Sequence, residues 1–400
     1  MDTAVIGRAG LTALIDVLKD RGYTVVGPTV RDEAIVLAEI GSAEELPFGV
    51  GVSLDAGRYR VRQRADGAAF AHSAGPQSWK TFLHPPGVQL WRTRRDGSEP
   101  ASAEEENGSR ERWADVEGTA KRTYAFVGVR PCDLAAIGVL DTVLGAGKYP
   151  DEIYTSRRDG VFVVAVECTE PGDTCFCASM GTGPGATNGY DLALTELVDE
   201  TNHRFVVRVG SEAGAQVFAA LPGEPAGGGA VEAQRAVSQA AKQMTRRMPD
   251  GMREVLAGSR ESSHWDDVAS RCLTCGNCTL VCPTCFCTTT EDVSDLTGEH
   301  AERWRRWDSC FDLDFSYIHG GSIRRSSASR YRQWMTHKLS TWHDQFGSSG
   351  CVGCGRCIVW CPVGIDITAE AAALNGAAPT GPPATSTGEG RAGEKTREER

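Results

Sequence analysis

Two short runs of cysteine have the same spacing and lie far apart in the chain. The first occupies residues 272–283 and the second residues 351–362, and each reads C-x2-C-x2-C-x3-C-P. Thiolates at this spacing ligate [4Fe-4S] clusters, with three cysteines of a run on one cluster and the fourth on its neighbour. The pattern therefore predicts two adjacent [4Fe-4S] clusters, each of which is held by both runs.

We expect the last cysteine of each run to cross over to the cluster of the other run. The first predicted cluster is bound by Cys272, Cys275, Cys278 and Cys361, and the second by Cys351, Cys354, Cys357 and Cys282. Zinc and disulfides are the alternatives. Zinc sites usually draw their four ligands from two separated pairs, whereas each run here supplies four cysteines by itself.

Seven further cysteines remain, and the tetrapeptide Thr-Cys-Phe-Cys occurs twice, at residues 174–177 and 284–287. One group could hold a third [4Fe-4S] cluster, since it offers the four thiolates that such a cluster needs: Cys132, Cys168, Cys175 and Cys177. Ordinary buried cysteines are the alternative. The last three could donate weak S–H hydrogen bonds, tune the cluster potentials or complete a site with ligands from the first half: Cys285, Cys287 and Cys310.

The first half of the chain alternates strand and helix patterns, which predicts an α/β domain over residues 1–230. Apolar runs typical of buried strands occupy residues 123–129 and 160–166, and helical patterns occupy residues 11–22 and 134–144. Cys132 and Cys168 follow the two predicted strands directly. Open α/β sheets place their sites at the carboxyl ends of strands, so we expect these two thiols to lie close together.

The two cysteine runs are predicted to belong to a mostly helical dicluster ferredoxin domain over residues 231–370. Helical patterns occupy residues 233–256, a charged stretch at 299–306 and a basic, aromatic stretch at 324–339. The basic helix could dock an acidic partner subunit or raise the cluster potentials. Residues 98–118 and the tail 371–400 have few large apolar residues, and we expect both to be solvated or disordered.

Composition and charge exclude several classes of function. The net charge of −11 argues against nucleic acid as a partner, and there is no run of about 18 apolar residues for a membrane span. The sequence has no secretory signal, and 15 cysteines then indicate metal binding in a reducing compartment, so we expect a cytoplasmic protein. We find no dinucleotide fingerprint, phosphate loop or Ser/His/Asp arrangement, and hence no catalytic centre beyond iron–sulfur chemistry.

Several of these motifs together resemble one family. The segments concerned are residues 127–137, Cys168 with 175–177, 189–192, 306–310, 282–285 and 351–357. They resemble the beta (iron–sulfur) subunit of cytoplasmic NAD(P)-linked [NiFe] hydrogenases of the sulfhydrogenase type. The iron–sulfur, electron-transfer subunit of anaerobic sulfite reductase is a near relative with similar motifs.

The resemblance implies a subunit that passes electrons within a larger complex. Its partners would be the hydrogenase large and small subunits, together with one that carries FAD and binds NAD(P). The complex would couple H2 oxidation to NAD(P)+ reduction, reversibly. Three other hypotheses remain open: the sulfite reductase subunit, an autonomous enzyme with a catalytic cluster, and an iron–sulfur scaffold or redox sensor.

Overall fold

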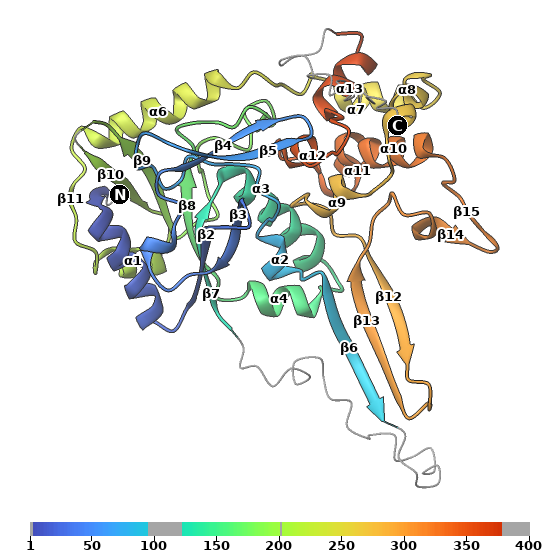
Figure 1. Cartoon of the computed structure of the whole chain (residues 1–400), viewed down its shortest axis with the longest axis horizontal. Coiled ribbons are helices and arrows are strands. Elements are labelled where there is room, and N and C mark those ends of the chain that lie inside the picture. The colour runs from blue at the N-terminus through green and yellow to red at the C-terminus, as the bar shows by residue number, and fades with distance from the viewer. Residues whose placement is uncertain (1–2, 95–121, 201, 378–400) are drawn as a thin grey trace, which may run out of the picture.

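A mixed sheet of eight strands forms the centre of the N-terminal half (Figure 1). The computed structural model describes residues 3–94, 122–200 and 202–377. Across the sheet the strands are β11 (Glu224–Pro225), β1 (Thr3–Gly7), β10 (His203–Val209), β9 (Leu192–Val198), β8 (Phe162–Glu167), β7 (Tyr124–Val129), β2 (Thr24–Arg31) and β3 (Ala34–Glu39). Strands β2, β7, β8 and β9 are parallel, and the strands outside them pair antiparallel.

Helices cover both faces of this sheet. On one face lie α1 (Arg8–Asp20) and α5 (Glu212–Phe218), and on the other lie α2 (Lys80–Leu83), α3 (Pro131–Leu140), α4 (Glu152–Arg158) and α6 (Gly229–Gln243). Helix α1 buries Leu11, Leu14 and Leu18, which recur at helical spacing. Strand β7 is buried along its whole length, as its continuous apolar run predicts. The two strands and two helices predicted in this half are confirmed, although the second helix turns into a π-helix over Asp141–Gly145.

The C-terminal half consists of short helices around a second core. They are α7 (Met252–Gly258), α8 (His264–Arg271), α9 (Asn277–Leu280), α10 (Ser327–Thr336), a π-helical turn (His337–Thr341), α11 (Trp342–Phe346), α12 (Arg356–Val359) and α13 (Ile367–Leu374). Trp265, Phe311, Trp334 and Leu339 are buried in this core, and cysteines of both runs pack against it. The predicted basic helix is confirmed as α10 with its π-helical extension.

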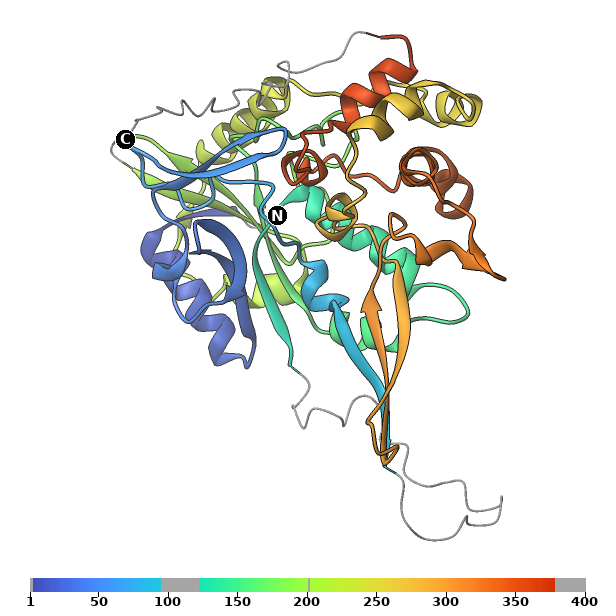
Figure 2. The same ribbon diagram turned by 45° about the vertical axis from the view of Figure 1, so that its right-hand side comes forward.

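A three-stranded antiparallel ribbon projects from the body as an arm, in both views (Figures 1 and 2). Its strands are β12 (Thr288–Ser294), β13 (His300–Trp307) and β6 (Gly87–Arg94), in that order. Strand β13 covers all but the first residue of the stretch 299–306 that we predicted as a charged helix, so that prediction is wrong. It pairs with β12 on one side and with β6, from the N-terminal half, on the other. The C-terminal half is therefore only partly helical.

Two hairpins complete the described fold. They are formed by β4 (Val50–Asp55) with β5 (Arg58–Gln63) and by β14 (Tyr317–Ile318) with β15 (Gly321–Ser322). The stretch 98–118 and residues 378–400 of the predicted tail lie outside the described residues. Within the described part of the chain, no helix is both long enough and apolar enough to cross a bilayer. The domain limits remain a prediction.

Candidate metal centres

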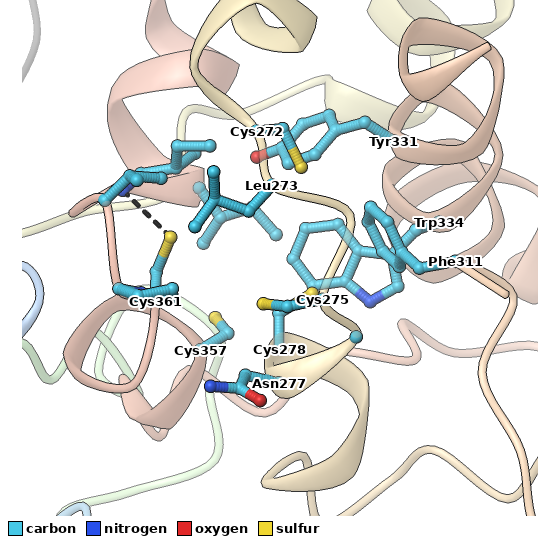
Figure 3. A pocket seen from close by; sticks show the side chains of 15 residues that line it. Cys272, Leu273, Cys275, Asn277, Cys278, Phe311, Tyr331, Trp334, Cys357 and Cys361 are labelled. Atoms are coloured by element: carbon cyan, nitrogen blue, oxygen red, sulfur yellow. Dashed lines mark hydrogen bonds between the residues drawn. The ribbon is translucent and has the colours of Figure 1, made fainter.

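The first run of cysteines lines a cavity next to α8 and α9 (Figure 3). Helix α8 ends at Arg271, and the chain then turns as far as Gly276, at φ 75°, which directly precedes α9. Glycine adopts this left-handed conformation without strain, so it allows the tight turn that carries the thiols. Five cysteines line the cavity: Cys272, Cys275, Cys278, Cys357 and Cys361. The structure therefore brings Cys361, from the end of the second run, to the first three cysteines of the first run.

Aromatic side chains and backbone amides surround these sulfur atoms. Phe311, Tyr331 and Trp334 form one wall of the cavity. The backbone N–H groups of Thr274 and Ile365 donate to the sulfur atoms of Cys272 and Cys361, at 3.4 and 3.3 Å. Amide donors of this kind stabilise negative charge on sulfur and influence the potential of a bound cluster. Cys275 is exposed, so this cavity lies at the surface of the described chain.

The second run lines a neighbouring cavity. The cysteines that line this second cavity are Cys282, Cys351, Cys354 and Cys357. Cys282 comes from the end of the first run, and Cys357 borders both cavities. Helices α9 and α12 pack together, with the Asn277 amide donating to the Trp360 carbonyl at 3.3 Å. The two cavities thus bring the eight cysteines of the two runs together, with Cys357 at both cavities, and the assignment of these thiols to two clusters remains a prediction.

The spread of the sulfur atoms favours a cluster over a single ion. Four sulfur ligands around one zinc lie about 3.8 Å apart, since each Zn–S bond is about 2.3 Å. Among the described residues, no three cysteine sulfur atoms all lie within 4.8 Å of one another. Both cavities are also lined in part by apolar and aromatic side chains. These donor sets fit a multi-iron core, for which thiolates are the usual ligands.

Burial keeps most of these thiols protonated until a metal replaces the proton. It raises the pKa of Cys351 and of Cys354 to about 12. Burial, followed by the neighbouring thiols of Cys310 and Cys361, also raises the pKa of Cys278 well above its usual value. Binding of iron must therefore release protons from these positions.

A buried lysine lies beside the second cavity. Lys338 is 3% exposed, and its ammonium donates to Thr284 Oγ1 at 2.8 Å and to the Gly350 carbonyl at 3.2 Å. The S–H of Cys285, and then the charge of Lys338, hold the pKa of Cys282 well below its usual value. From the sequence we predicted that this basic stretch docks an acidic partner or raises the cluster potentials. The burial of Lys338 beside the cysteines favours the second alternative for this residue.

The candidate third group also comes together. Cys132 is the second residue of α3, which follows β7. Cys168 follows β8, and the loop after it carries Cys175 and Cys177. A hydrogen bond with Cys177, together with burial, raises the pKa of Cys132. Burial raises the pKa of Cys168 to about 11 and of Cys175 to about 12, with Cys132 as a further cause in both. Binding of a third [4Fe-4S] cluster by these four thiols remains a prediction.

This third group packs directly on the loop of the second cavity. The Phe176 N–H donates to the Gly353 carbonyl at 2.9 Å, and Thr182 Oγ1 donates to the Val352 carbonyl at 2.6 Å. The Cys175 sulfur lies 3.9 Å from the Cys354 carbonyl oxygen. The three groups of cysteines therefore form a continuous series from the exposed Cys275 into the α/β half.

A buried ion pair lies between the second and third groups. Arg356, which begins α12, donates to both carboxylate oxygens of Asp133 at 2.8 and 3.1 Å, and both residues are buried. Asp133, Cys354 and Cys132 hold the pKa of Arg356 above its usual value, although burial opposes this. Sequence reasoning did not identify either residue as part of the site. The only available signals were their positions next to predicted ligand cysteines.

One further group of metal-ligand residues has a simpler explanation. His264, Asp267 and Glu370 place three donor atoms within 4.8 Å of one another. Arg271 already pairs with Asp267 at 3.1 Å and with Glu370 at 3.0 Å. Arg271 thus compensates part of the charge of the two carboxylates, and His264 contacts Glu370 at 2.8 Å, so we interpret the group as an ion-pair network between α8 and α13.

Comparisons with known proteins agree with this geometry. Residues 271–365 match the family model described as a 4Fe-4S dicluster domain. The chain is similar to sulfhydrogenase 2 subunit beta of Pyrococcus furiosus, with 33% identity over 262 residues, which cover 63% of this chain and 73% of that protein. No solved structure matches the chain.

Proposed function

Since the chain belongs to the family of sulfhydrogenase beta subunits, we propose that it relays electrons through a series of [4Fe-4S] clusters within a hydrogenase complex. Bound clusters would supply one-electron transfer, and the chain's own residues would set their positions and surroundings. The observation that carries the proposal is the adjacency of the two cysteine-lined cavities, which share Cys357.

Two features of the series support a relay. Cys275 and the neighbouring Leu273, which is 61% exposed, give one end a surface where a partner could exchange electrons. The third group of cysteines extends the series on the other side of the second cavity, through the contact between Cys175 and Cys354. A path with one end at the surface and the other beside the α/β half suits a protein that connects two redox modules.

The proposed partners are the hydrogenase large and small subunits and an FAD- and NAD(P)-binding subunit. The relative found by sequence is a sulfhydrogenase subunit, which favours this complex over an anaerobic sulfite reductase. We further propose a cytoplasmic complex, because a reducing compartment keeps so many thiols available for iron.

The test uses the whole complex. Co-expressed with these partners, the chain should co-purify, and H2 should reduce NAD(P)+. In the Cys354→Ser variant, NAD(P)+ reduction should fall at least about tenfold, while H2-dependent reduction of a dye by the hydrogenase module should persist. The exposed Lys242→Gln variant serves as the control and should keep both activities. Unchanged NAD(P)+ reduction in Cys354→Ser, or no association with a hydrogenase module, would contradict the proposal.

A further inference from the structure

Three cysteines remain after these groups are assigned, and the arm brings them to one end of a hairpin. Cys285 and Cys287 lie just before β12, and Cys310 lies three residues after β13 ends. The two strands pair with Thr288 opposite Trp307, and the Asp308 N–H donates to the Cys287 carbonyl at 2.9 Å. Pairing of β12 with β13 therefore brings the segment of Cys285 and Cys287 next to the segment of Cys310, more than twenty residues later in the chain. We call this place, where the two strands leave the body, the base of the arm.

A second buried lysine faces this base. Lys80, on α2, is 3% exposed, and its ammonium donates to the carbonyls of Cys285 at 3.0 Å and of Leu280 at 3.4 Å. The ammonium also lies 3.9 Å from the centre of the Trp307 ring. Within the described residues, no carboxylate lies within ion-pair distance of it. A buried charge without a counter-charge is costly, so Lys80 indicates that an anionic group belongs beside it.

The thiols themselves are the nearest source of that negative charge. Cys285, Cys282 and Cys287 are all electrostatic neighbours of Lys80, and Cys287 is an electrostatic neighbour of Cys310. Thiolates bound to a metal at this place would supply the negative charge that Lys80 lacks.

The repeated tetrapeptide points independently to the same site. Thr-Cys-Phe-Cys at 174–177 presents two thiols of the third group and rests on the second-cavity loop through Phe176 and Gly353. Its copy at 284–287 rests on the beginning of the same loop, since Thr284 Oγ1 donates to the Gly350 carbonyl at 2.6 Å. Two identical segments thus lie against one loop, and each presents a C-x-C pair.

We propose that Cys285, Cys287 and Cys310 hold a further iron–sulfur cluster at the base of the arm, distinct from the other three groups. Asp308 is the fourth donor in this assignment. It is only partly exposed, its carboxylate accepts the N–H of Ser309, and it is an electrostatic neighbour of Cys287. A single ion does not fit, because no three of these donors lie within 4.8 Å of one another among the described residues. The site would adjoin the second cavity through Cys285 and Cys282.

The test counts iron and acid-labile sulfide in the full chain after anaerobic reconstitution. Cys287→Ser and Cys310→Ser should each lose about four iron atoms relative to wild type, the content of one cubane. Thr288→Ser, beside the site but without a ligand role, should lose none. EPR signals that Cys272→Ser and Cys351→Ser remove should remain in both variants, which separates a lost site from a misfolded chain.

A double variant distinguishes this site from the candidate third group. If Cys175→Ser and Cys287→Ser remove separate clusters, their iron losses should add to about eight atoms. An unchanged iron count in Cys287→Ser and Cys310→Ser would overturn the proposal, and a shifted potential alone would mean that the thiols only tune the second cluster. If either arm variant is insoluble, the count in Cys175→Ser, which lacks any cluster of the third group, decides: about twelve iron atoms require the cluster at the arm, and about eight contradict it.

Discussion

Lys338 and Arg356 place two buried positive charges beside the cysteines of the second cavity. Arg356 has a bidentate carboxylate partner in Asp133, so its charge is largely neutralised locally. Lys338 donates to a hydroxyl and a carbonyl, and among the described residues it has no carboxylate within ion-pair distance. Its charge therefore acts on whatever the cysteines bind, and a positive charge stabilises the more negative, reduced state of a cluster.

We accordingly predict that Lys338→Gln lowers the reduction potential of the second cluster. The expected shift is on the order of 60 mV, which is a tenfold change for one electron. An EPR-monitored redox titration of the purified chain measures it. Lys242→Gln removes an equal charge from the exposed face of α6 and should leave the potential unchanged. A potential that stays the same or rises in Lys338→Gln would exclude this electrostatic role.

The Asp133–Arg356 pair should matter for stability. Asp133→Asn leaves a buried guanidinium without its counter-charge, and we expect unfolding to become easier by about 3–5 kcal/mol. Denaturant unfolding of the iron-loaded chain measures the change. Asp344→Asn removes a pair with Arg253 in which both side chains are more than half exposed, and it should cost under about 1 kcal/mol. Equal effects of the two variants would show that the buried pair has no special role.

At the scale of elements, the loop at residues 350–355 acts as a platform for both Thr-Cys-Phe-Cys segments. Gly355 is at φ 75°, and a Cβ there would lie 2.4 Å from the carbonyl oxygen of Thr174. Thr284 contacts the other end of the loop at Gly350. The close approach of the first segment therefore depends on the absence of a side chain at Gly355.

Gly355→Ala should separate the third group from the second cavity. We expect a loss of about 1–3 kcal/mol from the backbone conformation alone, and a further loss from the clash with Thr174. Iron content should fall, with Gly258→Ala as the control, since a Cβ at Gly258 meets nothing within 4 Å. Full iron content and unchanged stability in Gly355→Ala would contradict this packing role.

The arm shows where sequence reasoning stops. Residues 299–306 contain good helix formers, and we predicted a helix from them, but they form β13 between β12 and β6. Strand β6 ends about two hundred residues earlier in the chain, and pairing with such a distant segment overrides local propensity. The strands β7 and β8 were predictable because each is a continuous apolar run that is buried on both faces.

The residues of the candidate site also fall into those that the sequence predicted and those that it did not. The repeated cysteine spacing is local and carries its own ligand rule, so the grouping of Cys282 and Cys361 followed from sequence. Lys80 and Asp133 gave no such signal, because their roles arise only when α2 and α3 pack around the cysteines. Lys338 was predicted only as part of a basic stretch that could raise the cluster potentials, without any sign that it is buried. Charged residues are usually solvated, and only their burial distinguishes these three.

At the scale of the whole molecule, the chain encloses many thiols whose ordinary state in the absence of metal is neutral. Burial raises the pKa of Cys175, Cys351 and Cys354 to about 12, against about 8.5 in an unfolded chain. Above a pH of about 8.5 the unfolded chain therefore binds fewer protons than the folded chain. The contribution of these thiols to the stability of the metal-free chain is therefore complete below that pH, and it decreases as the pH rises toward about 12.

Removal of iron should thus make the fold sensitive to alkali. Between about pH 8.5 and 9.5 we expect the unfolding free energy of the chelator-treated chain to fall by about 1 kcal/mol for each such thiol, because the unfolded thiol goes from half to about nine-tenths ionised. Urea unfolding followed by circular dichroism measures it. The iron-loaded chain should show a much weaker dependence, because its thiolates are already ionised and bound. A metal-free chain whose stability is constant or rises over this interval would refute this expectation.

The central claim is that the last cysteine of each run belongs to the cavity of the other run. EPR and Mössbauer spectra of four serine variants test it most directly, with Cys272→Ser and Cys351→Ser as the references for the two clusters. We predict that Cys361→Ser loses the same signal as Cys272→Ser, and that Cys282→Ser loses the same signal as Cys351→Ser. If Cys361→Ser instead matches Cys351→Ser, each run binds its own cluster and the interleaved arrangement is wrong.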